Sequence, residues 1–273
     1  MKIGTWTATA VVAIAVMAPI GTASTAPASP LRPVPTFSPG TVAGANVNPD
    51  PLIRQGPKLT GTGIVGDGGF GDSVALSSDG NTALIGGPLD NGETGAAWLF
   101  TRSGSTWTQH GPKLTGGGER GRGRVGTSVV LSSDGDLALI GGSRDRGNVG
   151  AAWVFTRSGS TWTQRGPKLT GTGERGPGHF GASVSLSSDG DLALIGGTGD
   201  NSDVGAAWMF TRSGSTWTQR GKKLTGNGER GKGSFGNAVP LSSDGDTALI
   251  GGPDDNGGVG AAWAYVNPRR ERP

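Results

Sequence analysis

The sequence predicts an all-β fold, a β-propeller of four four-stranded antiparallel blades. The first observation is an internal repeat: nearly the same sequence begins at Phe70, Val125, Phe180 and Phe235, 55 residues apart each time. The second is that apolar residues within each copy alternate with a period of two, which is typical of strands. The third is the regular placement of Asp-Gly and Ser-Gly pairs, which favour tight turns. A fixed period of this size marks an array of repeats or a propeller.

The third copy illustrates how one repeat divides into four strands. The expected strands A, B, C and D cover residues 180–186, 192–195, 206–211 and 217–224. Strand B is a continuous apolar run, as in strands that are covered on both faces. Strand D is more polar and carries Arg220, Lys222 and Lys223, which suits an outer edge strand.

The two ends of the array predict how it closes. Residues 52–59 match 107–114 and therefore supply a strand D, whereas the last copy stops after strand C at residues 263–265. Pairing the N-terminal strand D with the C-terminal strands A–C gives four complete blades and removes an exposed edge. The alternative is that two chains complete a larger ring, so a monomer and a ring-completing dimer are both open.

The flanks of the repeats predict export. Residues 1–26 combine a short positive start, an apolar run and small residues, as in a secretory signal peptide. Residues 27–50 form a Pro-rich linker, 51–267 the repeat domain and 268–273 a basic tail. We therefore expect a secreted, extracellular or cell-surface protein of bacterial type; a signal retained as an anchor is the alternative.

The repeat resembles the FG-GAP repeat of integrin alpha-chain propellers, in its bacterial secreted form, over residues 52–265. The resemblance rests on Phe-Gly at 70–71, 180–181 and 235–236, with Val125-Gly126 departing, and on Gly-Gly-Pro at 86–88 and 251–253, with Ser143 and Thr198 replacing Pro. It implies a propeller that serves in adhesion or recognition. The integrin-type repeat also binds calcium in an Asp-rich loop between strands A and B.

Calcium is the one cofactor that the resemblance raises, and the matching loops are poor in carboxylates. The weak candidate ligands are Asp134, Asp136, Asp189 and Asp191. Calcium prefers six to eight oxygen ligands, often from several carboxylates. A simple hairpin turn is therefore the favoured interpretation, and no cofactor is expected.

The connections between strands B and C and between D and A vary most among the copies, and in a blade they emerge on the same face. We call this face the loop face. Its recurring charged residues are the candidate ligand-binding set, because loops on a rigid scaffold commonly carry binding: Asp90, Asp145, Asp200, Asp255, Arg120, Arg175 and Arg230. The alternative is that they are solvated turn residues forming weak surface pairs.

The predicted function is a non-enzymatic binding or adhesion module for extracellular protein or carbohydrate. An extracellular polysaccharide hydrolase with paired loop carboxylates, or a purely structural repeat protein, are the alternatives. Trp107, Trp162 and Trp217 could stack on sugars, but packing beneath the adjacent turn is more usual. His110 and His179 are not repeated, the chain has no cysteine, and no basic-aromatic runs indicate nucleic acid.

Overall fold

The computed structural model describes residues 52–267. The predicted signal peptide, the whole Pro-rich linker and the basic tail lie outside the described residues. Within residues 52–267, no helix is long and apolar enough to span a membrane.

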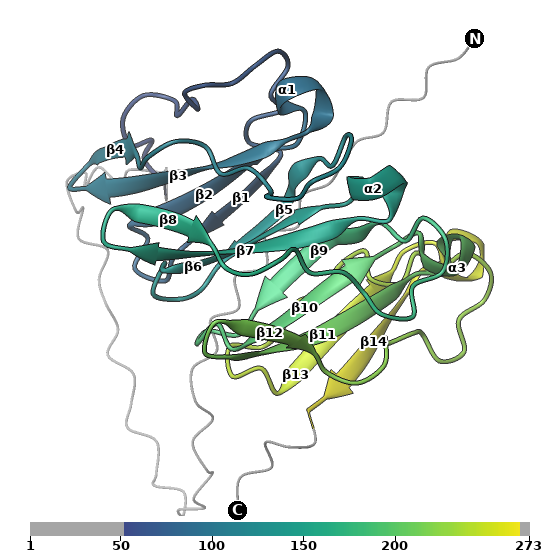
Figure 1. Cartoon of the computed structure of the whole chain (residues 1–273). Helices are drawn as coiled ribbons and strands as arrows, with labels where there is room; N and C mark the ends of the chain where they lie inside the picture. Colours follow the sequence, from purple (N-terminus) through teal and green to yellow (C-terminus); the bar gives the residue numbers. More distant parts are fainter. Residues whose placement is uncertain (1–51, 268–273) are drawn as a thin grey trace, which may run out of the picture.

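The described chain is all-β and consists of four repeated antiparallel sheets (Figure 1). The first sheet contains β1 (Ser73–Leu76), β2 (Thr82–Gly87), β3 (Ala96–Ser103) and β4 (Thr106–Gln109). The second contains β5 (Val125–Leu131), β6 (Leu137–Gly142), β7 (Ala151–Ser158) and β8 (Thr161–Gln164). The third contains β9 (Phe180–Leu186), β10 (Leu192–Gly197), β11 (Ala206–Ser213) and β12 (Thr216–Gln219). The fourth pairs β13 (Thr247–Gly252) with β14 (Ala261–Val266).

The predicted strands are confirmed in order and in pairing, with longer or shorter ends. Strand B extends into the Gly-Gly pair, and every residue of β2, β6 and β10 is buried. The predicted strand D is interrupted after Gln219, and Leu224 then bridges back to Ala207. Strand A of the fourth copy is reduced to isolated bridges from Ala238 and Leu241. Pro240 stands where the third copy has Ser185, and proline has no N–H to donate to a ladder.

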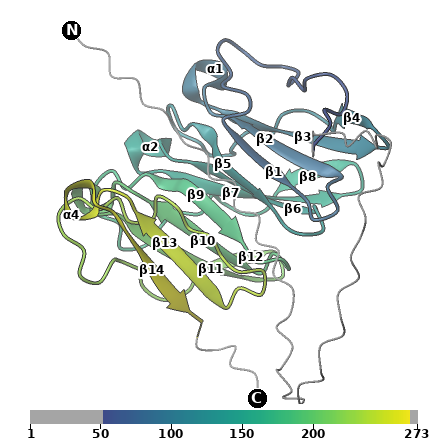
Figure 2. The same cartoon turned by 180° about the vertical axis from the view of Figure 1, so that it is seen from behind.

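Each sheet packs its face on the next sheet, so the sheets follow one another diagonally across the molecule (Figures 1 and 2). Leu84, Leu99 and Leu114 of the first repeat meet Val125, Ile140 and Trp153 of the second in one buried cluster. The same arrangement recurs between the second and third repeats and between the third and fourth. Trp98, Trp153 and Trp208 are fully buried.

Glycine allows the backbones of neighbouring sheets to approach closely. A Cβ on Gly86 would lie 2.2 Å from the carbonyl oxygen of Gly126, and one on Gly141 would lie 2.1 Å from that of Gly181. The interface is therefore built from backbone as well as side chains, which explains part of the high glycine content.

The turns divide between two opposite ends of the sheets, as predicted. At one end, the A–B turns bond from repeat to repeat: Ser78 N–H donates to Ser133 O, Ser133 to Ser188 and Ser188 to Ser243. At the other end, the B–C and D–A connections lie together, since Asn91 N–H donates to Val65 O at 2.9 Å. The array is thus propeller-like, and the same packing geometry recurs at each of the three interfaces between its sheets.

The expected closure of the ring is not seen in the described residues. β14 pairs only with β13, and residues 52–59 form no strand. Residues 59–63 nevertheless lie against the first sheet, where Trp98 Nε1 donates to Thr62 O at 2.8 Å. The corresponding bond from Trp153 to Gly117 O places the D–A connection against the second sheet in the same way.

Candidate functional site

Each B–C connection on the loop face is a single tight turn. These turns are α1 (Asp90–Glu93), α2 (Asp145–Asn148), α3 (Asp200–Asp203) and α4 (Asp255–Gly258). The second and third residues of each have positive φ, for example Arg146 at 53° and Gly147 at 71°. They are compact turns rather than regular helices, and the left-handed residues suit Asn and Gly.

The aspartate that begins each turn joins three segments of chain. In the second repeat, Asp145 Oδ1 accepts the backbone N–H of Arg120 at 2.7 Å, and Oδ2 accepts from Lys168 Nζ. Asp90 makes the same contacts with Val65 N–H and Lys113, and Asp200 makes them with Arg175 N–H and Lys223. Asp255 has the contact with Arg230 N–H at 2.6 Å.

These four candidate aspartates are buried, with exposed fractions of 1, 1, 0 and 9% for Asp90, Asp145, Asp200 and Asp255. A buried carboxylate needs such compensating donors, because an uncompensated charge is costly in the interior. Their role in this structure is to fasten the loops, and burial withdraws them from direct contact with a ligand.

The candidate arginines contribute their backbone to the buried network and leave their side chains exposed. Arg120, Arg175 and Arg230 each give their N–H to one of the buried aspartates, while their side chains are exposed. The scaffold therefore fixes the position of these arginines and leaves their guanidinium groups on the loop face.

The glutamate that precedes each of these arginines is partly buried, and the pKa of its carboxyl is raised. Burial, and then the charge of Asp200, raise the pKa of Glu174 to about 7. Burial and Asp255 raise the pKa of Glu229 to about 7. The pKa of Glu119 is also raised by burial, although Glu119 Oε1 accepts Gly123 N–H at 2.8 Å. Within residues 52–267, Glu229 Oε1 is buried without a hydrogen-bond partner, whereas the backbone N–H of Gly178 bonds the Glu174 carboxyl and partly offsets the effect of its burial.

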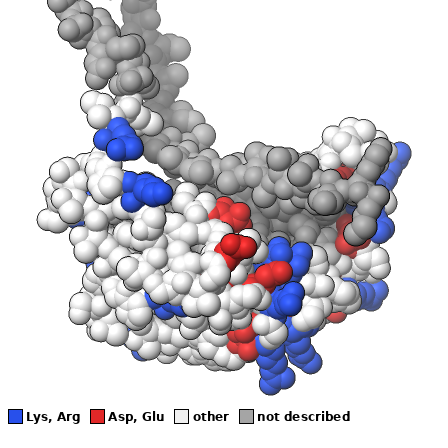
Figure 3. Space-filling view, turned by 90° about the horizontal axis from the view of Figure 1, so that it is seen from above, with Lys and Arg blue, Asp and Glu red and all other residues white. Residues whose placement is uncertain are grey.

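An arginine cluster lies on the loop face between the first and second sheets. Glu93 Oε2 accepts from Arg124 at 2.7 Å and lies 3.5 Å from Arg144, and Glu93 Oε1 lies 3.7 Å from Arg122. The hydrogen bond and charge of Arg124, followed by the charges of Arg144 and Arg122, lower the pKa of Glu93. The exposed side chains of Arg120 and Arg146 belong to the same two loops. Seen from above, one strip of the surface carries both acidic and basic side chains, and further basic side chains lie on either side of it (Figure 3).

The equivalent positions at the other two interfaces are not arginine-rich. Between the second and third sheets, Asn148, Pro177 and Gly199 replace Glu93, Arg122 and Arg144. Between the third and fourth, Lys232 and Asp203 form a balanced pair at 3.0 Å. Arg120 was predicted from the sequence as a candidate, whereas Arg122, Arg124, Arg144 and Arg146 were missed. Arginine is frequent in the loops at 119–124 and 144–146, which could have indicated a basic site. Only the packed structure shows that these two loops lie together.

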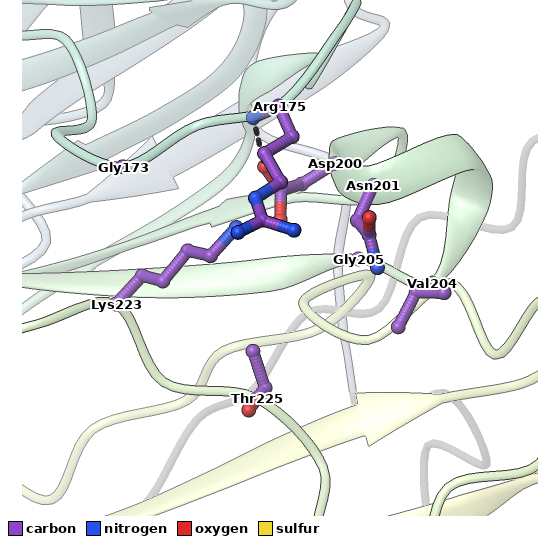
Figure 4. Close-up of a pocket in the computed structure, with 8 residues that line it drawn as sticks. All are labelled: Gly173, Arg175, Asp200, Asn201, Val204, Gly205, Lys223 and Thr225. Carbon is purple, nitrogen blue, oxygen red and sulfur yellow. Dashed lines mark hydrogen bonds and ion pairs between the residues drawn. The ribbon is translucent and has the colours of Figure 1, made fainter.

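Two shallow cavities lie beside the loops. One of about 400 Å³ is lined by Asp145, Arg146, Lys168 and Glu174, among others. The other, of about 180 Å³, is lined by Arg175, Asp200, Lys223 and Thr225, among others; the dashed line in Figure 4 marks the bond from Arg175 N–H to Asp200. Both contain the buried lysine–aspartate pairs in their walls, so each is bordered by groups that already have partners.

The four weak calcium candidates lie in A–B turns and bond within the protein. Asp134 Oδ1 accepts from Ser132 Oγ at 2.5 Å and Asp136 N–H at 3.0 Å, and Asp189 bonds Ser187 and Asp191 likewise. Asp136 pairs with Arg157 at 2.5 Å, and Asp191 pairs with Arg212 at 2.7 Å. Among residues 52–267, no group of three or more His, Cys, Asp or Glu side chains is arranged to hold a metal ion.

Of the remaining sequence candidates, all but His179 are separated from the loop residues. Trp107, Trp162 and Trp217 are half-buried in the outer strands and pack against the apolar clusters. His110 Nε2 lies 2.9 Å from Ser160 O. His179 is half-buried at the loop face, where burial and the charge of Arg144 lower its pKa.

Comparisons with known proteins supply no family for this chain. No protein-family profile and no curated protein sequence matches it significantly. Among solved structures, one described as TolB from Agrobacterium tumefaciens is 17% identical with a TM-score of 0.45, over 71% of this chain and 57% of that one. Kuenenia stuttgartiensis hydrazine synthase is 13% identical with a TM-score of 0.47, over 77% of this chain and 49% of that one. Neither likeness is close enough to transfer a function.

Proposed function

We propose that the chain is a secreted or cell-surface binding module, not an enzyme, that recognises extracellular glycan or protein bearing repeated anionic groups. The observation that supports this proposal is the arginine cluster, in which Arg122, Arg124 and Arg144 converge on the single carboxylate of Glu93. Two further exposed arginines belong to the same loops, so positive charge exceeds negative charge there.

The chemistry of the cluster suits carboxylate, sulfate or phosphate groups. A guanidinium group is planar and can donate two parallel hydrogen bonds to one such anionic group. Arg122 and Arg144 are the most available members of the Glu93 group, with side chains 75% and 44% exposed. A strip of charge over several loops fits an extended polymer better than a small molecule, which usually needs an enclosing pocket.

The wider setting agrees with an extracellular role. Residues 1–26 have the pattern of an export signal, and the FG-GAP resemblance belongs to propellers of adhesion and recognition. A complete propeller would hold the loop face rigidly.

The test is binding of the full chain to heparin, polygalacturonate, polyglutamate and neutral dextran, measured by titration at low and physiological salt. We expect at least one anionic polymer to bind, dextran not to bind, and salt to weaken binding. Arg122→Ala combined with Arg144→Ala should weaken binding at least about tenfold, or about 1.4 kcal/mol. The polysaccharide and polyglutamate arms separate glycan from protein recognition.

A matched control removes the same charge elsewhere. Arg165 and Arg220 follow the outer strands β8 and β12 at equivalent positions. Their double alanine variant should bind within about twofold of wild type, because surface charges far from a site act weakly through salt. Equal losses in both double variants, or no binding to any anionic polymer, would contradict the proposal.

A polysaccharide hydrolase is the second candidate, and Glu174 is the observation that favours it. A half-buried carboxyl with a pKa near 7 resembles a general acid, and it lines the larger cavity together with Asp145. Asp145 is however bonded to Lys168 and Arg120 N–H, so it lacks a free oxygen for a second catalytic role. Glu174→Gln leaving any polymer cleavage unchanged would dispose of this candidate.

A further inference from the structure

We propose that the chain associates head to tail with a second copy of itself. In this arrangement the leading segment (residues 52–59) and the first sheet of one copy cover the open edge and bare face of the fourth sheet of the other. The proposal is independent of the arginine cluster. Its template is the sheet-to-sheet interface that the chain already contains three times.

The fourth sheet leaves bare the face that earlier sheets bury. Leu84, Leu139 and Leu194 are 0% exposed, whereas the equivalent Leu249 is 49% exposed. Ala97, Ala152 and Ala207 are likewise fully buried, and the equivalent Ala262 is exposed. In the three internal interfaces this face is covered by the next sheet, so the missing cover has a known shape.

Asp255 lacks the lysine that its three equivalents have. Asp90, Asp145 and Asp200 each pair with a lysine from the strand D that follows, namely Lys113, Lys168 and Lys223. Asp255 is 9% exposed, and within residues 52–267 the structure shows no basic side chain paired with it. Lys58 occupies the matching position of the leading segment and is exposed. Lys58 of a second copy therefore supplies the missing partner.

The glycines that face a neighbouring backbone at the internal interfaces have open space beside them at the two ends of the array. Gly141 and Gly150 closely face the backbone at Gly181 and Phe180 in the next repeat. The equivalent Gly251 has Ala238 Cβ as its nearest neighbour, at 3.6 Å, and Gly71 has nothing within 4 Å. An approaching first sheet would use the space at Gly251 and Gly71 as Gly181 uses it at Gly141.

The leading segment already has the position of a preceding strand D. It leads into the Trp98–Thr62 bond, which repeats those of Trp153 and Trp208, and Leu59 packs on the first sheet. The apolar side chains at the start of the leading segment are uncovered in the described structure, since Leu52 is 88% exposed and Ile53 is 78% exposed. Within residues 52–267, no strand D lies beside β14 and no strand C lies beside the leading segment.

A second copy joins these ends without changing any internal interface. The register of β3 with β4 predicts that Val266 lies opposite Ile53, Tyr265 opposite Arg54 and Ala262 opposite Leu59. Closure within one chain would instead require the present arrangement of all three interfaces to alter until the ends meet. Two copies joined at both pairs of ends leave no free edge, which favours a closed dimer over an open filament.

Charge exchange tests the pairing in the full chain. Light scattering should give wild type twice the mass of one 27.3 kDa chain. Lys58→Asp and Asp255→Lys should each be monomeric, because each alone places like charges together. An equimolar mixture should regain the dimer, since both of its junctions then pair opposite charges. A monomeric wild type, or a mixture that stays monomeric while both variants are folded, overturns the proposal.

Gly251→Ala keeps the test decisive if Asp255→Lys does not fold. The isolated chain has room for this methyl group, whereas the joined chain places a carbonyl there. Circular dichroism should therefore show a folded protein and light scattering a monomer. A Gly251→Ala dimer as stable as the wild-type dimer would equally overturn the proposal.

Discussion

The carboxylate of Asp145 illustrates how single residues organise the loop face. It joins its own turn to the Arg120 backbone and to Lys168, three segments that are distant in sequence. The recurrence of this aspartate in every copy was interpreted as a ligand-binding position. Its burial and its lysine partner could not be predicted, because they depend on packing between loops that no local pattern reveals.

The raised pKa values of Glu174 and Glu229 predict how stability depends on pH. Both carboxyls ordinarily titrate near 4.5 and in the folded chain near 7. Between these pH values the folded state keeps protons that the unfolded state releases, so stability falls as pH rises through this window. Thermal melts of wild type from pH 4 to 8 should show this decline, and Glu174→Gln should reduce it.

Glu119→Gln provides the comparison for that measurement. Both carboxyls accept a backbone N–H, Glu119 from Gly123 at 2.8 Å and Glu174 from Gly178, but Glu174 is the more deeply buried of the two. We therefore expect Glu119→Gln to change the pH dependence less than Glu174→Gln. Identical pH profiles for wild type and Glu174→Gln would contradict the raised pKa of Glu174.

At the scale of elements, the strands were predictable and the contacts between sheets were not. Alternating apolar residues and Asp-Gly turns located β9, β10 and β11 within two residues at each end. The break after Gln219 and the loss of a regular strand around Pro240 were not anticipated, because both depend on how a strand meets its neighbour. The arginine cluster was missed for the same reason, since Glu93 and Arg144 come from different repeats.

Glycine substitutions test the close packing of one sheet on the next. A Cβ on Gly141 would lie 2.1 Å from Gly181 O, and backbone cannot move away as a flexible side chain can. Gly141→Ala should destabilise the fold by about 1–3 kcal/mol in denaturant unfolding, as overpacking does. Both substitutions are compared in the Lys58→Asp background, which we expect to be monomeric, and there Gly251→Ala should have little effect. Similar losses for both would show that the close approach is not what requires glycine.

At the scale of the whole molecule, the chain is an array whose two ends complement each other. The bare face at Leu249, the unpaired edge of β14 and the single-sided contact of Asp255 all occur at one end. Lys58, Leu52 and Ile53 are exposed at the other. The repeat period predicted that these ends would pair, but a repeat cannot specify whether the partner is the same chain or another copy. The angle between neighbouring sheets decides whether the two ends of one chain can meet. This angle depends on many small contacts between the sheets.

A disulfide between the ends tests this account most directly, because the chain contains no cysteine of its own. Directly opposite residues of antiparallel strands have Cα atoms about 4.5–5.5 Å apart, within the span of a disulfide. The full chain carrying both Ile53→Cys and Val266→Cys, oxidised in dilute solution, should give a covalent dimer that reductant returns to single chains. Neither single-cysteine variant should link efficiently. A disulfide formed within one chain, or none at all, would contradict head-to-tail pairing of two copies.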